Sequence, residues 1–113
     1  MAINLKQVAG VSIIEIADKN VDSRTVSSIQ HELIPLIESN NKFIIDLSQV
    51  SYMSSSGLRM LLSSYRKVTD KNGKLILVGL SEEIQDTMSV TGFLDFFQHS
   101  ENATTGLALF LEK

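Results

Sequence analysis

Three consecutive serines, Ser54, Ser55 and Ser56, are the residues of this chain whose type and spacing best suit a chemical role. A serine hydroxyl can cap a helix, and it can also accept a phosphoryl group. Gly57 follows directly, and an amphipathic segment begins at Leu58. A helix N-terminus has unpaired backbone N–H groups and the positive end of the helix dipole, and both favour a negative charge. The cluster therefore has two interpretations, a structural cap within a flexible loop or a place for a phosphate.

Other kinds of chemistry have little support in the sequence. The 113 residues contain no cysteine, so disulfides, thiol catalysis and thiolate metal ligands are excluded. The glycine-rich phosphate loops and the Gly-x-Ser-x-Gly motif are also missing. His31 and His99 have no neighbouring residues at metal-ligand spacing, and a Ser-His-Asp triad stays open only in geometric terms. We therefore expect a protein that is not an enzyme, with no cofactor and no metal.

Composition and charge restrict the class of partner. The net charge is −3 and the isoelectric point is near 5.3, which does not favour binding to nucleic acid or to an anionic membrane surface. The N-terminal residues 1–6 lack the pattern of a signal peptide. No apolar run approaches the roughly 20 residues that span a bilayer. We expect a cytoplasmic protein without direct membrane insertion.

The elements that must position the serines follow from the hydrophobic pattern. Alternating and continuous apolar segments predict strands at 3–8, 11–17, 42–47, 74–80 and 96–97. A first helix should follow Asp22 or Ser23 as its cap, and Pro35 should kink it or end its regular part near Ile34. The second helix should begin after the serines and end at Asn72-Gly73. A third should run from Ser81 to Gly92, and a fourth should cover 107–111.

The order β-β-α-β-α-β-α-β-α predicts the fold class. Strands that alternate with helices indicate an α/β protein whose sheet is mixed but mostly parallel, with an antiparallel N-terminal strand and about four helices. We expect residues 1–113 to form a single domain. One core should contain residues of the second helix and of two central strands: Leu58, Leu61, Leu62, Ile44, Ile45, Ile76 and Val78. Binding sites in such sheets lie beyond the carboxyl ends of the strands, which is where 48–56 falls.

The longest recognisable motif of the chain runs from Asp46 to Leu58. Its sequence, Asp-Leu-Ser-Gln-Val-Ser-Tyr-Met-Ser-Ser-Ser-Gly-Leu, resembles the signature of the anti-sigma factor antagonists, the bacterial STAS-domain proteins. Three shorter matches support the resemblance: Val21-Asp22, Asn72-Gly-Lys-Leu and Thr91-Gly-Phe-Leu. The resemblance covers the whole chain and implies a STAS-like fold.

The resemblance also implies a function, partner switching. In that family the serine that precedes the glycine is phosphorylated, and here it is Ser56. The implied partners are an anti-sigma factor with a histidine-kinase-like ATPase fold, which is also the serine kinase, and a PP2C-type phosphatase that resets the protein. Ser54 stands where the family often has an acid, so Ser55 and Ser54 stay open as alternative phosphorylation sites.

The expected partner-binding residues surround the serines. They are Asp22, Met53, Ser54, Ser55, Ser56, Gly57 and Met60. Met60 lies off the apolar stripe of its helix, which favours contact with a partner, whereas Leu58 belongs to the stripe and so to the core. Gly57 either allows a close backbone approach or simply starts the helix, and Asp22 either caps the first helix or borders the site.

Two other functions remain open at the level of the sequence. One is an adaptor subunit of a signalling or lipid-transport complex that is never phosphorylated, which the missing acid at position 54 favours. The other is a nucleotide-binding protein or weak hydrolase that uses the same loop, and the absence of a phosphate-binding glycine loop argues against it.

Overall fold

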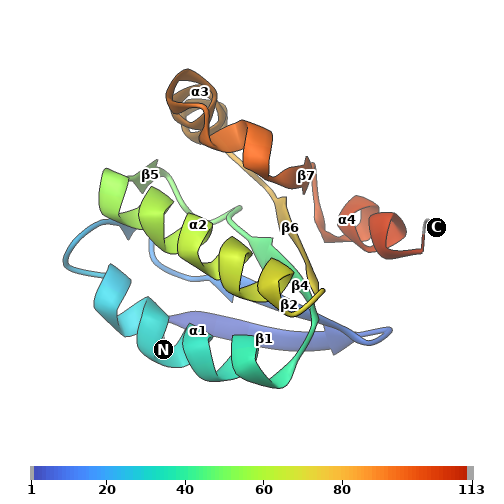
Figure 1. The fold of residues 1–113 in the computed structure, drawn as a ribbon. Coiled ribbons are helices and arrows are strands. Elements are labelled where there is room, and N and C mark those ends of the chain that lie inside the picture. The colour runs from blue at the N-terminus through green and yellow to red at the C-terminus, as the bar shows by residue number, and fades with distance from the viewer. Residues whose placement is uncertain (1, 112–113) are drawn as a thin grey trace.

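The computed structural model describes residues 2–111, which form an α/β fold (Figure 1). Its elements in chain order are β1 (Ile3–Val8), β2 (Val11–Ile16), β3 (Asn20–Val21), α1 (Val26–Ser39), β4 (Lys42–Asp46), β5 (Tyr52–Met53), α2 (Ser55–Asp70), β6 (Lys74–Val78), α3 (Glu82–Thr91), the 3-10 turn η1 (Phe93–Phe96), β7 (Gln98–Ser100) and α4 (Ala103–Phe110).

The main sheet has five strands in the order β1-β2-β4-β6-β7. β1 pairs with β2 in antiparallel fashion, and the other three pairings are parallel. The predicted fold class is therefore confirmed. A second sheet, which the sequence pattern did not predict, joins β3 to β5 in parallel through two residue pairs.

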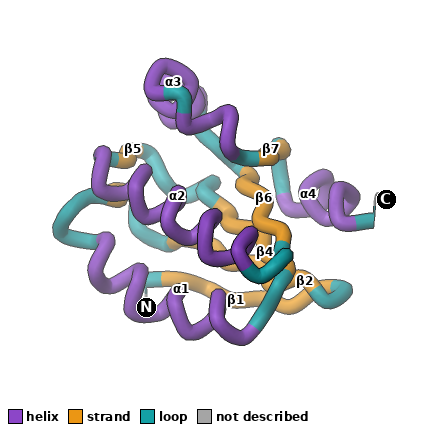
Figure 2. The backbone as a smooth tube through the Cα atoms, viewed as in Figure 1, coloured by secondary structure: helices purple, strands orange, loops and turns teal. Residues whose placement is uncertain are grey.

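The helices cover both faces of the main sheet. Figure 1 shows α1 and α2 side by side across one face, and α4 beyond β6 and β7, while Figure 2 separates these helices from the strands by colour. Because side chains alternate along a strand, Phe43 and Ile45 of β4 pack beneath α1 and α2, and Ile44 points to the face that α4 covers.

The hydrophobic residues consequently form two clusters instead of the single core that we expected. Leu58, Leu61 and Ile45 belong to the larger cluster, between the sheet and the pair α1 and α2. Ile44, Ile76 and Val78 belong to the smaller one, under α4. The continuous apolar runs of β4 and β6 arise because each strand is buried on both faces.

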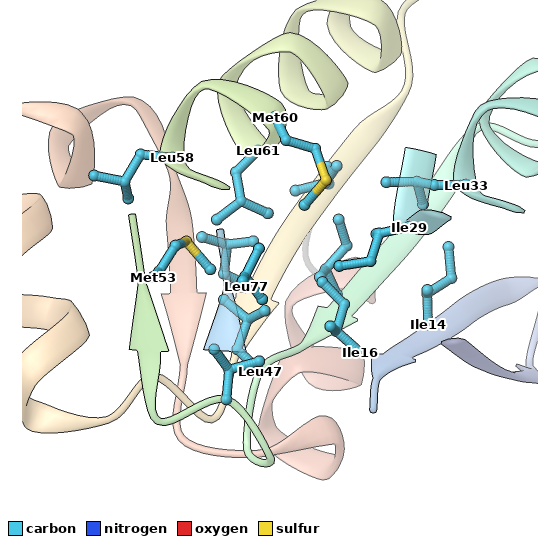
Figure 3. Packing of buried hydrophobic residues seen from close by; sticks show 14 of the residues in the cluster. Ile14, Ile16, Ile29, Leu33, Leu47, Met53, Leu58, Met60, Leu61 and Leu77 are labelled. Carbon is cyan, nitrogen blue, oxygen red and sulfur yellow. The ribbon is translucent and has the colours of Figure 1, made fainter. Parts of the chain in front are cut away.

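Two residues of α2 lie on different sides of the helix from those predicted. Met60 is 2% exposed, and Figure 3 shows it among the buried side chains, with Leu61 on one side and Ile29 and Leu33 of α1 on the other. This corrects the interpretation that Met60 reaches a partner, because α1 packs against α2 and widens its buried face. Leu62, expected in the core, is only half-buried and belongs to neither cluster.

The first helix differs from its prediction in part. Pro35 does not end it, since α1 continues to Ser39. Proline removes one helical N–H bond, and the cost is reduced here because both Pro35 and His31, whose carbonyl loses that donor, are exposed to water. The residue at the N-cap is Thr25, and neither Asp22 nor Ser23 holds that position.

The C-terminal third is shifted by a few residues from the expected pattern. Gly92 ends α3 in the left-handed conformation, as predicted, and the turn η1 follows it. The last strand therefore begins at Gln98, while Phe97 packs edge-on against Tyr65 of α2 with ring centroids 5.2 Å apart. α4 begins at Ala103, earlier than expected, because Asn102 and Thr105 form a capping box.

Candidate functional site

The serine segment is fixed at its start by the small sheet. The backbone N–H groups of Ser51 and Tyr52 donate to the carbonyl of Lys19, at 2.8 and 3.1 Å, and that of Ser54 donates to the carbonyl of Val21 at 2.8 Å. These bonds place the end of β5, and with it the first turn of α2, directly beside the end of β3. The chain thereby holds the three serines in a defined position.

The three serines have different surroundings. Ser54 is the N-cap of α2, and its hydroxyl accepts a long hydrogen bond of 3.5 Å from the N–H of Gly57. Ser55 is exposed and Ser56 is half-buried, and both lie in the first turn. Within residues 2–111 no acceptor pairs with the backbone N–H of Ser55 or Ser56. The first turn therefore presents unpaired donors and the positive end of a 16-residue helix to the solvent.

Gly57 is required by the close packing of α2 on β3. A Cβ atom at this position would lie 2.6 Å from Cγ of Met53 and 2.9 Å from Cγ1 of Val21. Both distances are far shorter than ordinary van der Waals contact. Of the two interpretations left open for Gly57, the structure supports the close approach.

Asp22 lies at the end of β3, beside the residue whose carbonyl binds Ser54. Its carboxylate accepts a hydrogen bond of 2.9 Å from the backbone N–H of Arg24 and forms an ion pair of 3.2 Å with the Arg24 guanidinium. The hydrogen bond from the Arg24 side chain, together with that from its backbone, lowers the pKa of Asp22. Asp22 therefore braces the turn before α1 and stays ionised, next to the serine segment.

Three of the residues expected to touch a partner are buried. Met53 is 6% exposed, Met60 is 2% exposed and Gly57 lies under the packed start of α2. In this conformation Met53, Gly57 and Met60 pack in the interior beneath the serine segment. Of the rest of the expected set, Ser55 is exposed, and Asp22, Ser54 and Ser56 are half-buried.

Tyr52 and the part of α3 next to it were not among the site residues expected from the sequence. Tyr52 is 53% exposed and lies two residues before Ser54. A small cavity of about 40 Å³ separates the Tyr52–Met53 pair and Leu58 from Glu83, Ile84 and Thr87 of α3. An exposed aromatic residue inside a polar segment was the available signal, since the strand pattern alone gave it no role.

The part of the chain that the structure describes contains no group of three or more His, Asp or Glu side chains placed to hold a metal ion. Across the same residues, no helix has the length and apolar character needed to cross a bilayer.

The arrangement of a mixed sheet, covering helices and a serine loop that precedes α2 agrees with comparisons to known proteins. A family model described as the STAS domain matches residues 2–106. The chain belongs to the STAS domain family. The resemblance to the anti-sigma factor antagonists, expected from the motif at 46–58, is confirmed.

Individual relatives carry the same description. The chain is 30% identical to the "Anti-sigma-B factor antagonist" of Bacillus subtilis, over 77% of this chain and 80% of that protein. A solved anti-sigma factor antagonist from Mycobacterium paratuberculosis has a TM-score of 0.87 and 21% identity, and covers 97% of this chain and 93% of its own. The antagonist SpoIIAA in its unphosphorylated form has a TM-score of 0.78 and 18% identity, with 99% of both chains covered. Its phosphorylated form has a TM-score of 0.73 and 19% identity, and covers 96% of this chain and 99% of its own.

Proposed function

We propose that this protein is an anti-sigma factor antagonist that acts by partner switching, with Ser56 as the residue that is phosphorylated. The observation that carries the proposal is the position of Ser56. Ser56 is half-buried in the first turn of α2, which follows β5 of the small sheet, in a fold shared with antagonists. In the unmodified state the protein binds an anti-sigma factor, and binding releases a sigma factor.

The physical basis of the switch is a local change of charge. A phosphate adds about −1.5 to −2 charges and a bulky group at the contact surface. The first turn of α2 tolerates this charge because its N–H groups are unpaired and the helix dipole favours an anion. The fold thus survives modification, while a surface that matched the uncharged serine is lost.

The partners in this proposal are the ones that the motif implied. The anti-sigma factor is a serine kinase with a histidine-kinase-like ATPase fold, and a PP2C-type phosphatase removes the phosphate. The antagonist itself acts as a cytoplasmic binding module without catalytic turnover. Asp22, the exposed serine hydroxyls and Tyr52 form the contact surface, and Met53, Gly57 and Met60 hold it in place.

A second candidate is an adaptor that is never phosphorylated, and the specific observation in its favour is Ser54. This residue stands where the family often has an acid, and here it serves as the N-cap of α2. Phosphosite mapping of protein from its native cell separates the two functions, and it also decides among Ser54, Ser55 and Ser56. We expect phosphate on Ser56, and a protein unmodified under all growth conditions would favour the adaptor.

The direct experiment is a binding titration with the serine kinases of histidine-kinase-like fold that the source genome encodes. Ser56→Ala should bind its kinase as tightly as the unmodified protein and stay bound in ATP. Ser56→Asp should bind at least about tenfold more weakly, because an unpaired charge buried at an interface costs several kcal/mol.

The control for folding is Ser27, which is the second residue of α1 as Ser56 is the second residue of α2. Ser27→Asp and Ser56→Asp should both melt within a few degrees of the unmodified protein, because an acid in a first turn is favourable by about 0.3–1 kcal/mol. Equal affinities for unmodified protein, both Ser56 variants and the phosphorylated form would refute the switch. Unfolding of Ser56→Asp alone would show that Ser56 is a structural residue.

A further inference from the structure

The solvent-facing side of α2 carries positive charges in a row. Arg59 and Arg66 lie seven residues apart, which is two helical turns or about 10 Å along the axis, and Lys67 adjoins them. All three are exposed. We refer to Arg59, Arg66 and Lys67 as the basic stripe. It stands out because the whole chain has a net charge of −3.

The charges of the basic stripe are not neutralised by the protein itself. Within residues 2–111 the ion pair found within 4 Å joins Arg24 to Asp22, so no carboxylate pairs with the stripe. Asp70 is four residues after Arg66, at the spacing where a pair could form, and yet the two side chains do not meet. Three cations thus face the solvent with their full charge.

The basic stripe also lines a hollow, together with the apolar side chain of Leu62. The hollow has a volume of about 410 Å³ and is lined by Arg59, Leu62, Ser63, Arg66, Lys67 and Asp70. Leu62 is the half-buried residue that neither hydrophobic cluster includes. An apolar side chain next to charged ones is a common composition of protein-binding surfaces, which have an apolar core and a polar rim.

We propose that the basic stripe docks an acidic segment of the kinase partner, with an apolar side chain of that segment seated over Leu62. The inference rests on the proposed function and adds the charge of the partner surface. The positive charges of the stripe complement a negatively charged partner segment. The stripe is also continuous with the proposed contact surface, because the stripe and the serines belong to the same helix. Arg59 is three residues after Ser56, where side chains of a helix are neighbours, so a phosphate on Ser56 competes with the acidic segment for Arg59.

The test compares two variants with the same change of net charge. The double variant Arg59→Gln with Arg66→Gln removes two charges from the stripe. The control, Lys6→Gln with Lys42→Gln, removes two exposed charges elsewhere on the sheet. Glutamine keeps helix propensity at positions 59 and 66, and Lys6 and Lys42 are exposed strand residues, so both proteins should melt close to the unmodified protein.

The measurement is the association rate with the kinase that binds unmodified protein in the titration above. At low ionic strength the stripe variant should associate about tenfold more slowly than the control, since electrostatic steering accelerates association by about 10–10³-fold. Near 1 M salt, where the Debye length is about 3 Å, the difference should vanish.

Each outcome decides the inference. Equal rates for the two double variants would overturn it and leave the proposed function intact, provided that Ser56→Asp still weakens binding. A wild-type protein that binds none of the kinases would overturn both. If phosphatidylserine vesicles bind wild type but not the stripe variant, while kinase rates are equal, the stripe serves a membrane and the inference is wrong.

Discussion

At the level of single residues, the three adjacent serines have different tasks although their side chains are identical. The hydroxyl of Ser54 faces the helix and accepts from the N–H of Gly57, whereas Ser55 and Ser56 lie within the first turn and cap nothing. A cap hydroxyl is occupied by the fold, and a hydroxyl without a structural partner is free for modification. The structural interpretation of the cluster therefore applies to Ser54, and the proposed modification concerns Ser56.

Removal of the cap should therefore affect stability and not the switch. Ser54→Ala should lower the free energy of unfolding by about 0.5–1 kcal/mol, the lower part of the usual range for a cap, because its hydrogen bond is long at 3.5 Å. Ser54→Asp should be at least as stable as wild type, since aspartate caps well and its charge suits the helix dipole. Urea unfolding of the two variants measures this. A loss in Ser54→Asp equal to that in Ser54→Ala would contradict the cap.

Gly57 should tolerate no side chain. Gly57→Ala places a Cβ 2.6 Å from Met53 and within 3.0 Å of the backbone oxygen of Val21, so α2 and β3 must separate. We expect a loss of about 1–3 kcal/mol, as for other overpacked sites. Ser55→Ala, exposed two residues earlier, is the control and should change stability little. Urea unfolding that gives the two variants equal stability would mean that the helix does not approach β3 so closely.

The pKa of Asp22 should depend on Arg24. Because the hydrogen bond from Arg24 favours the ionised carboxylate, the pKa of Asp22 lies below its ordinary value of 3.8. The contribution of the ionised Asp22 to the stability of the fold is complete above pH 3.8, and it is lost as the pH falls through the lowered pKa of Asp22 in the folded state. Arg24→Gln should move the pKa back up towards 3.8, which NMR titration of the Asp22 carboxyl carbon measures. No upward movement would mean that the pair does not form in solution.

At the level of elements, the hydrophobic pattern predicted the long helices and strands whose apolar residues are regularly spaced. β2, β4 and β6 were found from apolar runs, and α2 was found from its stripe and from the Asn72-Gly73 stop. The two-residue strands β3 and β5 could not be found this way, because two residues show no period and the pairing joins segments 32 residues apart (20 with 52). Those strands position the serines. The sequence therefore revealed the serine motif but not the strand pairing that holds it in place.

The two leucines in the middle of α2 test the observed buried face. Leu61 is fully buried in the larger cluster, and Leu62 is half-buried outside both clusters. Leu61→Ala should cost about 2–5 kcal/mol through lost burial and a cavity, and Leu62→Ala should cost clearly less. Denaturant unfolding of the two variants, which carry the same chemical change, makes the comparison direct. Equal losses would place Leu62 in the core after all.

At the level of the whole molecule, the β-β-α-β-α-β-α-β-α order was enough to predict the class of fold. It was not enough to predict how the buried residues divide between the two faces. Ile44 and Ile45 are neighbours in an uninterrupted apolar run, and the sequence does not say which of them faces α4. That choice depends on where the last helix packs, and Gly106 of α4 settles it by coming close to Val78 and Ile44.

The small sheet that holds the serine segment has one further consequence. β3 and β5 contribute only one buried side chain each, Val21 and Met53, and a few backbone hydrogen bonds. Such a unit can open by a local fluctuation that costs much less than unfolding the five-stranded sheet. In the proposed switch, a kinase and a phosphatase both have to reach the hydroxyl of Ser56 in the first turn of α2, and transient fraying of that turn would admit them. On this proposal, the five-stranded sheet keeps the molecule folded, while the opening of the small sheet would set the rate at which Ser56 can be modified.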